Sequence, residues 1–359
     1  MDAYESVDRF DEGLKRIQDV ISERAKDPEA SGLEEVINSY TEFYLRTHTP
    51  QELKEHYYSF PGIRSTDRAA RALLRVAVIG VFEKVAKESE DEARKRDADA
   101  MIKVLFNELK SDFALKDLTN FILTKVGDYL RNNTATPREA LPYYDEVLGR
   151  SDQSQRFAAL LGRADVYGRS SNPADIEKAI EDFRRVYADS QEKGEREFAS
   201  YRIVELLMEK KDYAGVEKEA AVYLDREKTG FSQYPLQVGL TLARAYAAQK
   251  KVNDALAMYI KVWGGQLGNI STSAPATLEW MKLSWDRNFP AEKAGGKSDR
   301  QGAYDTGAIY IQLTEGLKDK MSSEELEIWT QIEQLTKTYE ADASVKSLEE
   351  QKKEKEGKR

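Results

Sequence analysis

Cysteine is absent from the 359 residues, which excludes disulfides, thiolate nucleophiles and cysteine-type zinc sites. Histidine occurs only twice, as His48 and His56. Glu52 and His56 are one helical turn apart, but no further ligand is evident, so ordinary polar residues around a helix start are expected there. We therefore expect no metal, no cofactor and no catalytic residue.

Long apolar runs are also missing. The most hydrophobic stretch, residues 73–82 (LLRVAVIGVF), is about half of the ~20 residues that a membrane-spanning helix needs. It predicts a helix that is buried on most sides, and no membrane span is expected. Only 21 glycines and 9 prolines accompany 33% charged residues, a mixture that favours long amphipathic helices over a sheet rich in turns.

An excess of basic residues is likewise absent. The net charge is −9, and residues 1–60 alone hold 14 Asp and Glu against 7 Lys and Arg. Nucleic-acid binding depends on Lys and Arg that neutralise phosphates, so we expect no nucleic-acid partner. The N-terminal MDAYESVDRFDEG has neither a basic nor an apolar segment of the signal-peptide kind. The cytoplasm is thus expected, and a bacterial periplasm is the alternative if a leader has been removed.

What the chain does contain is helical periodicity with well-marked helix starts. Thr49-Pro50, Thr136-Pro137 and Asn172-Pro173 each combine a capping residue with a proline at the first helical position. Ser322 followed by Glu325 is typical of a capping box. The expected helices cover 3–25, 33–46, 50–58, 66–87, 91–111, 115–131, 137–149, 153–168, 173–189, 193–209, 213–226, 233–249, 252–263, 274–287, 300–318 and 322–341.

One pattern recurs through the centre of the chain. A small residue is followed four residues later by an aromatic one in Ala140/Tyr144, Ala179/Phe183 and Ala255/Tyr259, with Val216 at the small position of a weaker copy. The spacings are 39, 37 and 39 residues. Before the last copy stand Leu242, Ala243 and Tyr246, which fit the end of a first helix. Small residues at these positions let paired helices approach closely.

This pattern resembles the tetratricopeptide repeat, in a lengthened form familiar from bacterial members. The resemblance implies an all-α fold: an α-solenoid of antiparallel helix pairs wound as a right-handed superhelix, with non-consensus helical flanks. The expected division is an N-terminal helical region of degenerate repeats or caps (1–110), repeats (111–268), a C-terminal helical region or cap (269–341) and a disordered charged tail (342–359). The alternative is a generic array of helical hairpins.

In this family the first helices line a concave groove that binds peptides, which implies a partner-binding site here. By position, its first row is mostly acidic and consists of Asp128, Asp165, Glu205 and Arg244. A mostly apolar row one helical turn earlier consists of Thr124, Leu161, Tyr201 and Leu240. Three acids of four in the first row favour a basic partner segment. The Lys and Asn that clamp the carboxylate of chaperone tails in one subfamily are absent. The alternative is that these charges are merely solvated.

Three other features of the sequence each have two interpretations. Residues 294–298 (AGGKS) end like a phosphate-binding loop, but Ala291 stands where the motif needs its first glycine, and no buried strand leads into the loop. An interhelical loop is therefore expected. Arg64, Arg68, Arg71 and Arg75 form a stripe that suits an acidic partner or, more simply, a solvated helix face. The four tryptophans lie in the last third and are expected in the core, with sugar stacking or partner anchoring as the alternative.

The expected function is therefore a non-catalytic scaffold or adaptor that binds another protein. The rival is an enzyme of the α/α-toroid kind acting on polysaccharide, which needs only two carboxylates and aromatic stacking. A closed ring of hairpins with acids in a deep central pocket would distinguish it.

Overall fold

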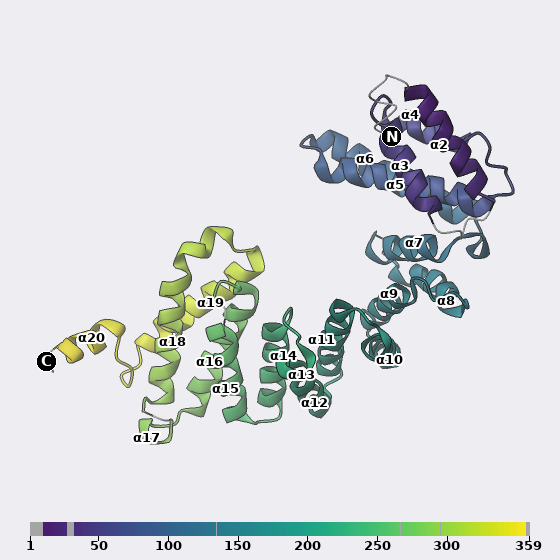
Figure 1. Cartoon of the computed structure of the whole chain (residues 1–359). Helices are drawn as coiled ribbons and strands as arrows, with labels where there is room; N and C mark the ends of the chain where they lie inside the picture. The colour runs from purple at the N-terminus through teal and green to yellow at the C-terminus, as the bar shows by residue number, and fades with distance from the viewer. Residues whose placement is uncertain (1–9, 27–31, 134, 266, 295, 357–359) are drawn as a thin grey trace. The chain divides into compact units, whose positions relative to one another are not determined.

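The computed structural model describes residues 10–26, 32–133, 135–265, 267–294 and 296–356 (Figure 1). The part of the chain it describes is built from helices and contains no strand. The chain forms two compact units, residues 1–170 and 171–359. The division falls inside the region that the sequence assigned to repeats. The boundaries of that repeat region at 110 and 268 stay a prediction.

The helices of the first unit follow one another with short connections. They are α2 (Phe10–Arg24), α3 (Leu33–Tyr44), α4 (Pro50–Tyr58), α5 (Arg68–Glu88), α6 (Glu92–Asp112), η1 (Leu115–Asp117), α7 (Asn120–Asn133), η2 (Pro137–Ala140), α8 (Leu141–Gly149) and α9 (Arg156–Gly168).

The second unit continues the pattern. Its helices are α10 (Pro173–Asp189), α11 (Lys193–Glu209), α12 (Tyr213–Leu224), α13 (Arg226–Thr229), α14 (Pro235–Ala248), α15 (Val252–Gly265), α16 (Ile270–Arg287), α17 (Ala291–Ala294), α18 (Asp299–Thr314), η3 (Glu315–Lys320), α19 (Ser323–Glu340) and α20 (Leu348–Glu356).

Packing between neighbours makes each unit an α-solenoid. Consecutive helices pack as hairpins, for example α5 with α6, α7 with α8, α10 with α11 and α14 with α15. Alternate helices also contact one another: α3 contacts α5, α5 contacts α7, and α7 contacts α9, so these four helices form one layer of the first unit. In the second unit α11, α14, α16 and α19 do the same. The expected all-α solenoid of antiparallel helix pairs is confirmed. No helix among the described residues is long and apolar enough to cross a bilayer.

The helix starts show why the boundaries were predictable. The Thr49 side chain accepts a hydrogen bond from the Glu52 amide (3.2 Å) while the Glu52 carboxylate accepts one from the Thr49 amide (2.7 Å), a full capping box. A second capping box begins α19 at Ser322. Thr136 behaves differently, because no backbone amide donates to its side chain and Pro137 opens the 3₁₀ turn η2 before α8 begins at Leu141.

The repeat positions lie where close packing requires small residues. Ala140, Ala179, Val216 and Ala255 are all fully buried. Their aromatic partners Tyr144, Phe183 and Tyr259 are buried as well, and they fill the space between adjacent helices. The recurring small-to-aromatic pattern is therefore a packing signature of successive hairpins.

The C-terminal segment differs from the disordered tail expected for 342–359. Residues 348–356 form α20, which is tied to α18. The Gln351 side chain donates to Asp305 (2.8 Å) and the Leu348 amide donates to the Tyr304 hydroxyl (3.3 Å). The low hydrophobicity of this segment hid these polar anchors, and the expectation was wrong for 348–356. Residues 357–359 lie outside the described residues.

Candidate functional site

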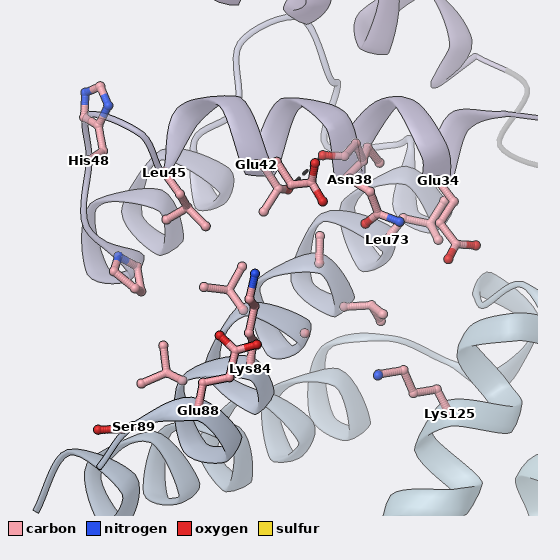
Figure 2. A pocket seen from close by; sticks show the side chains of 18 of the residues that line it. Glu34, Asn38, Glu42, Leu45, His48, Leu73, Lys84, Glu88, Ser89 and Lys125 are labelled. Carbon is pink, nitrogen blue, oxygen red and sulfur yellow. Dashed lines mark hydrogen bonds between the residues drawn. The ribbon is translucent and has the colours of Figure 1, made fainter. Parts of the chain in front are cut away.

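A hollow of the first unit lies between α3 and α5 with α7 at one end (Figure 2). Its volume is about 980 Å³, at the upper end of the range for ligand pockets. We call it the N-terminal groove. It is lined by Glu34, Ile37, Asn38, Thr41, Glu42, Leu45, His48, Pro50, Leu73, Val76, Ala77, Gly80, Val81, Lys84, Val85, Glu88, Ser89, Arg94, Phe121 and Lys125.

Helical periodicity places these residues on facing helix surfaces. On α3 the lining positions recur every three or four residues from Glu34 onward, and on α5 they recur in the same way from Leu73 to Glu88. The α5 face is about 22 Å long, at 1.5 Å per residue. In the view of Figure 2 the two helices are close near Glu34 and Leu73 and diverge toward His48 and Ser89. The N-terminal groove is therefore an elongated trough that could hold several turns of a partner.

The floor of the N-terminal groove is aliphatic and contains small residues. Ala77, Gly80 and Val81 are only partly buried, although all three are apolar. A Cβ atom added to Gly80 would have no atom within 4 Å, so the α5 backbone is bare at this point. Glycine in the interior of a helix costs about 0.5–1 kcal/mol relative to alanine. This position therefore gives up helix stability and leaves open space in the groove.

Charges line the N-terminal groove on several helices. Glu34 and Glu42 come from α3, whereas Lys84 comes from α5 and Arg94 from α6. Glu88 lies on the α5 side at the wide end (Figure 2). Among the described residues, Glu42, Lys84 and Arg94 have no ion-pair partner within the chain. These three charges are therefore available to a bound partner.

At the narrow end of the groove, the charged side chains Glu34 and Lys125 interact with other residues of the first unit. Burial raises the pKa of the Glu34 carboxyl, and so does the neighbouring Glu35, whereas Lys125 opposes that rise. Lys125 itself forms an ion pair with Glu83 at 2.9 Å. Charge at this end is thus partly neutralised within the first unit.

Of the residues predicted to bind a partner, four lie in the first unit. Asp128 accepts a hydrogen bond from the Tyr144 hydroxyl (2.8 Å) and pairs with Arg131 (3.2 Å). Arg131 also lies 3.7 Å from the Asp165 carboxylate, which pairs with Arg169 at 2.6 Å. Thr124 is buried, and its hydroxyl donates to the carbonyl of residue 120. Leu161 is half-buried on α9.

The other four lie in the second unit. Tyr201 donates to Glu205 (2.6 Å) and stacks on Tyr234, and Glu205 also pairs with Arg202 (2.8 Å). Leu240 is buried in a small core cluster of α14, α15 and α16. The fourth residue, Arg244, also has a partner within its own unit.

Arg244 forms a two-pronged ion pair with Glu279, with Nη2 at 2.6 Å and Nε at 3.0 Å from Oε1. The Tyr259 hydroxyl donates to the same carboxylate at 2.7 Å. This cluster joins α14, α15 and α16, so Arg244 has a structural partner. In both units the predicted row is therefore a series of charges that already have partners in their own unit.

The two histidines belong to an aromatic cluster. His56 Nε2 forms a 2.8 Å hydrogen bond with the Tyr40 hydroxyl, and its ring stacks with that of Tyr44. The His48 ring also stacks on Tyr44, with ring centroids 4.0 Å apart. Burial, and then the charge of His48, lowers the pKa of His56. Within the described residues no three His, Asp or Glu side chains gather as a metal site.

The arginine stripe joins elements of the first unit. Arg64 pairs with Asp67 at 2.9 Å, and Arg68 donates to Asp117 at 2.8 Å. Arg75 lies over the Tyr58 ring and donates to Asp112. Arg71 donates to a backbone carbonyl at 3.1 Å. The stripe thus bridges α5 to α6, to η1 and to the end of α4, and is not simply a solvated face.

The loop that resembles a phosphate-binding motif has its lysine engaged. Lys297 forms an ion pair with Asp305, and the Ser298 side chain caps α18 by accepting from the Gln301 amide. Gly295 lies outside the described residues. The segment is an interhelical loop with a capping residue, as the missing first glycine predicted.

The tryptophans take core and packing roles. Trp329 is buried, and its Nε1 donates to the Thr314 hydroxyl at 2.9 Å. Trp285 stacks on Tyr339 with ring centroids 3.7 Å apart. Trp263 and Trp280 are half-buried against the cluster of α14, α15 and α16.

Sequence reasoning missed the N-terminal groove because the flanking helices do not carry the repeat pattern. A usable signal was present in residues 73–82. Apolar side chains lie on more sides of this helix than the fold buries, so some of them stay half-buried. The half-buried Ala77, Gly80 and Val81 are the part of this run that faces the groove.

Neither a protein-family profile nor a curated protein matches the chain. Among solved structures, a signal transduction ATPase with numerous domains from Pyrococcus horikoshii, which has a tetratricopeptide repeat sensor, is similar. The identity is 14% and the TM-score 0.44, and the match covers 88% of this chain and 54% of that one. The chain thus spans about half the length of that structure. The fold and the N-terminal groove of this chain define a helical-repeat protein with an amphipathic groove.

Proposed function

We propose that this protein is a non-catalytic interaction scaffold of the tetratricopeptide-like kind that holds a segment of another protein. The observation that carries the proposal is the N-terminal groove, a trough of about 980 Å³ between the layered helices α3 and α5. Solenoids present extended concave surfaces of this type to their partners. Unpaired charges at Glu42, Lys84 and Arg94 supply polar rim contacts around the aliphatic floor.

We propose the acidic row of Asp128, Asp165 and Glu205 as a second contact. Helix α7 supplies Phe121 and Lys125 to the N-terminal groove and carries Asp128 one turn further on. A basic partner segment would there compete with Arg131 for Asp128 and Asp165. If the row binds a partner, the combined change Asp128→Lys, Asp165→Lys and Glu205→Lys lowers its affinity, and an unchanged affinity removes the row from the site.

The groove is tested by photocrosslinking. A benzophenone amino acid at Val81, inside the N-terminal groove, is compared with one at Val104, an exposed apolar position of α6 outside it. Proteins of the native cell that crosslink only from Val81 are then purified, and their affinity is measured for the unmodified chain and for Gly80→Leu. We expect Gly80→Leu to weaken binding about tenfold or more, because its side chain occupies the groove.

The matched control is Gly194→Leu on α11, where an added Cβ also meets nothing within 4 Å. It should leave affinity unchanged. If no purified candidate distinguishes Gly80→Leu from Gly194→Leu, the groove is not the interaction site and the proposed function fails.

A further inference from the structure

The chemistry of the groove floor restricts the conformation of its occupant. Between Glu34 and Glu42, helix α3 contributes two uncharged polar side chains to the N-terminal groove, Asn38 and Thr41. The Thr41 hydroxyl is already engaged, since it donates to the Ile37 carbonyl at 2.8 Å and shares a 2.6 Å hydrogen bond with Tyr57. The α5 side presents Leu73, Val76, Ala77, Gly80, Val81 and Val85.

An extended segment would place its backbone N–H and C=O groups against this aliphatic surface. Such groups are costly to bury without partners. A helix satisfies its own backbone hydrogen bonds and needs from the groove only an apolar surface for one stripe of side chains. Bare backbone at Gly80 and the small Ala77 leave room for a helix to approach α5 closely.

The rim charges restrict the occupant further. The α3 rim carries Glu34 and Glu42, and the opposite rim carries Lys84 and Arg94, with Glu88 as its acidic neighbour at the wide end. A helix lying along the trough therefore meets acids along one flank and mainly bases along the other. Opposite charges across an interface fix the register and orientation of a partner more than they raise its affinity.

Resting on the proposed function, we infer that the occupant of the N-terminal groove is an amphipathic α-helix of a partner protein. Its apolar residues recur every three or four positions and face Ala77, Gly80 and Val81. Its flank toward α3 is basic and meets Glu34 and Glu42, while its other flank is acidic and meets Lys84 and Arg94. The length of the α5 face corresponds to about four helical turns.

The inference is tested by selection from a display library of random 18-residue peptides. The full chain is the target, and Gly80→Leu serves as the counter-target so that only groove binders are retained. We expect enriched peptides to have apolar residues at helical spacing, no internal proline, and Lys or Arg on one flank. Circular dichroism of the synthesised peptides should show helix formation on binding.

Two charge variants then test the orientation. Glu34→Lys with Glu42→Lys should weaken binding of the selected peptides about fivefold. Glu35→Lys with Glu55→Lys makes the same change of net charge on α3 and α4 outside the groove and should leave binding unchanged.

The outcomes separate the two proposals. Enriched peptides that contain proline or alternate with a period of two would overturn the helix while leaving the groove as an interaction site. Peptides that bind Glu34→Lys/Glu42→Lys as tightly as the unmodified chain would overturn the orientation. No enrichment over the counter-target would overturn the inference, and the crosslinking from Val81 would then decide the proposed function separately.

Discussion

Tyr144 lies directly against Gly127, so closely that a Cβ atom on the glycine would be 2.7 Å from the tyrosine Cε1. Gly162 on α9 approaches the same ring from another helix. The Tyr144 hydroxyl reaches past these glycines to Asp128, at 2.8 Å. One aromatic residue of α8 thus joins α7 and α9, and the two glycines are needed because they leave room for its ring.

Gly127→Ala should therefore destabilise the first unit. Real Cβ contacts do not occur at 2.7 Å, so the buried ring or a helix must shift, and overpacking of this kind costs about 1–3 kcal/mol. The measurement is urea unfolding followed by circular dichroism.

Gly80→Ala is the control for that change. Position 80 is also inside a helix, but a Cβ there meets open space, so the higher helix propensity of alanine should stabilise by about 0.5–1 kcal/mol. Equal effects of Gly127→Ala and Gly80→Ala would contradict the proposed packing of Tyr144.

Glu197 should be an acid-sensitive anchor of the second unit. Its buried carboxylate accepts hydrogen bonds from the Tyr223 hydroxyl (2.7 Å), from the Ser232 amide (2.6 Å) and from the Gln233 amide. Burial alone would raise the pKa of Glu197, but these donors outweigh it, and the pKa lies below its ordinary value.

Because the folded pKa is lowered, the stabilisation is present above the unfolded value near 4.5 and is lost as the pH falls through the folded value. Glu197→Gln should cost about 2 kcal/mol at neutral pH and make stability less dependent on pH in acid. Glu227→Gln, at an exposed position, serves as the comparison and should change neither. Acid titrations of the unfolding midpoint measure both effects.

His56 should make the first unit less stable in mild acid. Burial among Tyr40, Tyr44 and Phe60 favours the neutral ring and lowers the pKa of His56 below 6.5. A lowered histidine pKa means that the unfolded chain binds more protons, so stability is full above pH 6.5 and declines as the pH falls toward the folded value.

The pKa of His56 can be measured by NMR, because the chain has only two histidines whose signals must be told apart. His56 should titrate below 6.5, and His48→Gln assigns the signals. His56→Gln should flatten the decline in stability below about pH 6.5. A His56 that titrates at or above 6.5 would contradict its placement in the aromatic cluster.

The helix α20 should show protection against hydrogen exchange. Its anchors are the Gln351 side chain on Asp305 and the Leu348 amide on the Tyr304 hydroxyl. Amides of residues 352–356 should exchange more slowly than in an isolated peptide, and Gln351→Ala should reduce the protection. Exchange at the rate of an unstructured peptide would instead restore the disordered tail that composition suggested.

The sequence determined the local structure of this protein to a large extent. Expected and observed helices coincide at 50–58, 173–189 and 193–209. At the first two, Thr49 and Asn172 cap the helix and a proline follows each of them. Small residues such as Ala140 and Ala255 were placed at close helix contacts by their spacing alone, and all are buried. These signals are local, since capping and amphipathic periodicity act within a few residues.

Only the tertiary structure decided where surfaces meet. It paired Asp165 with Arg131, and Arg244 with Glu279, because charges far apart in sequence become neighbours when hairpins stack. It also placed the groove between α3 and α5, where Gly80 faces open space. A hollow exists only between elements, and its shape depends on how packed helices diverge, which no pattern along one helix records.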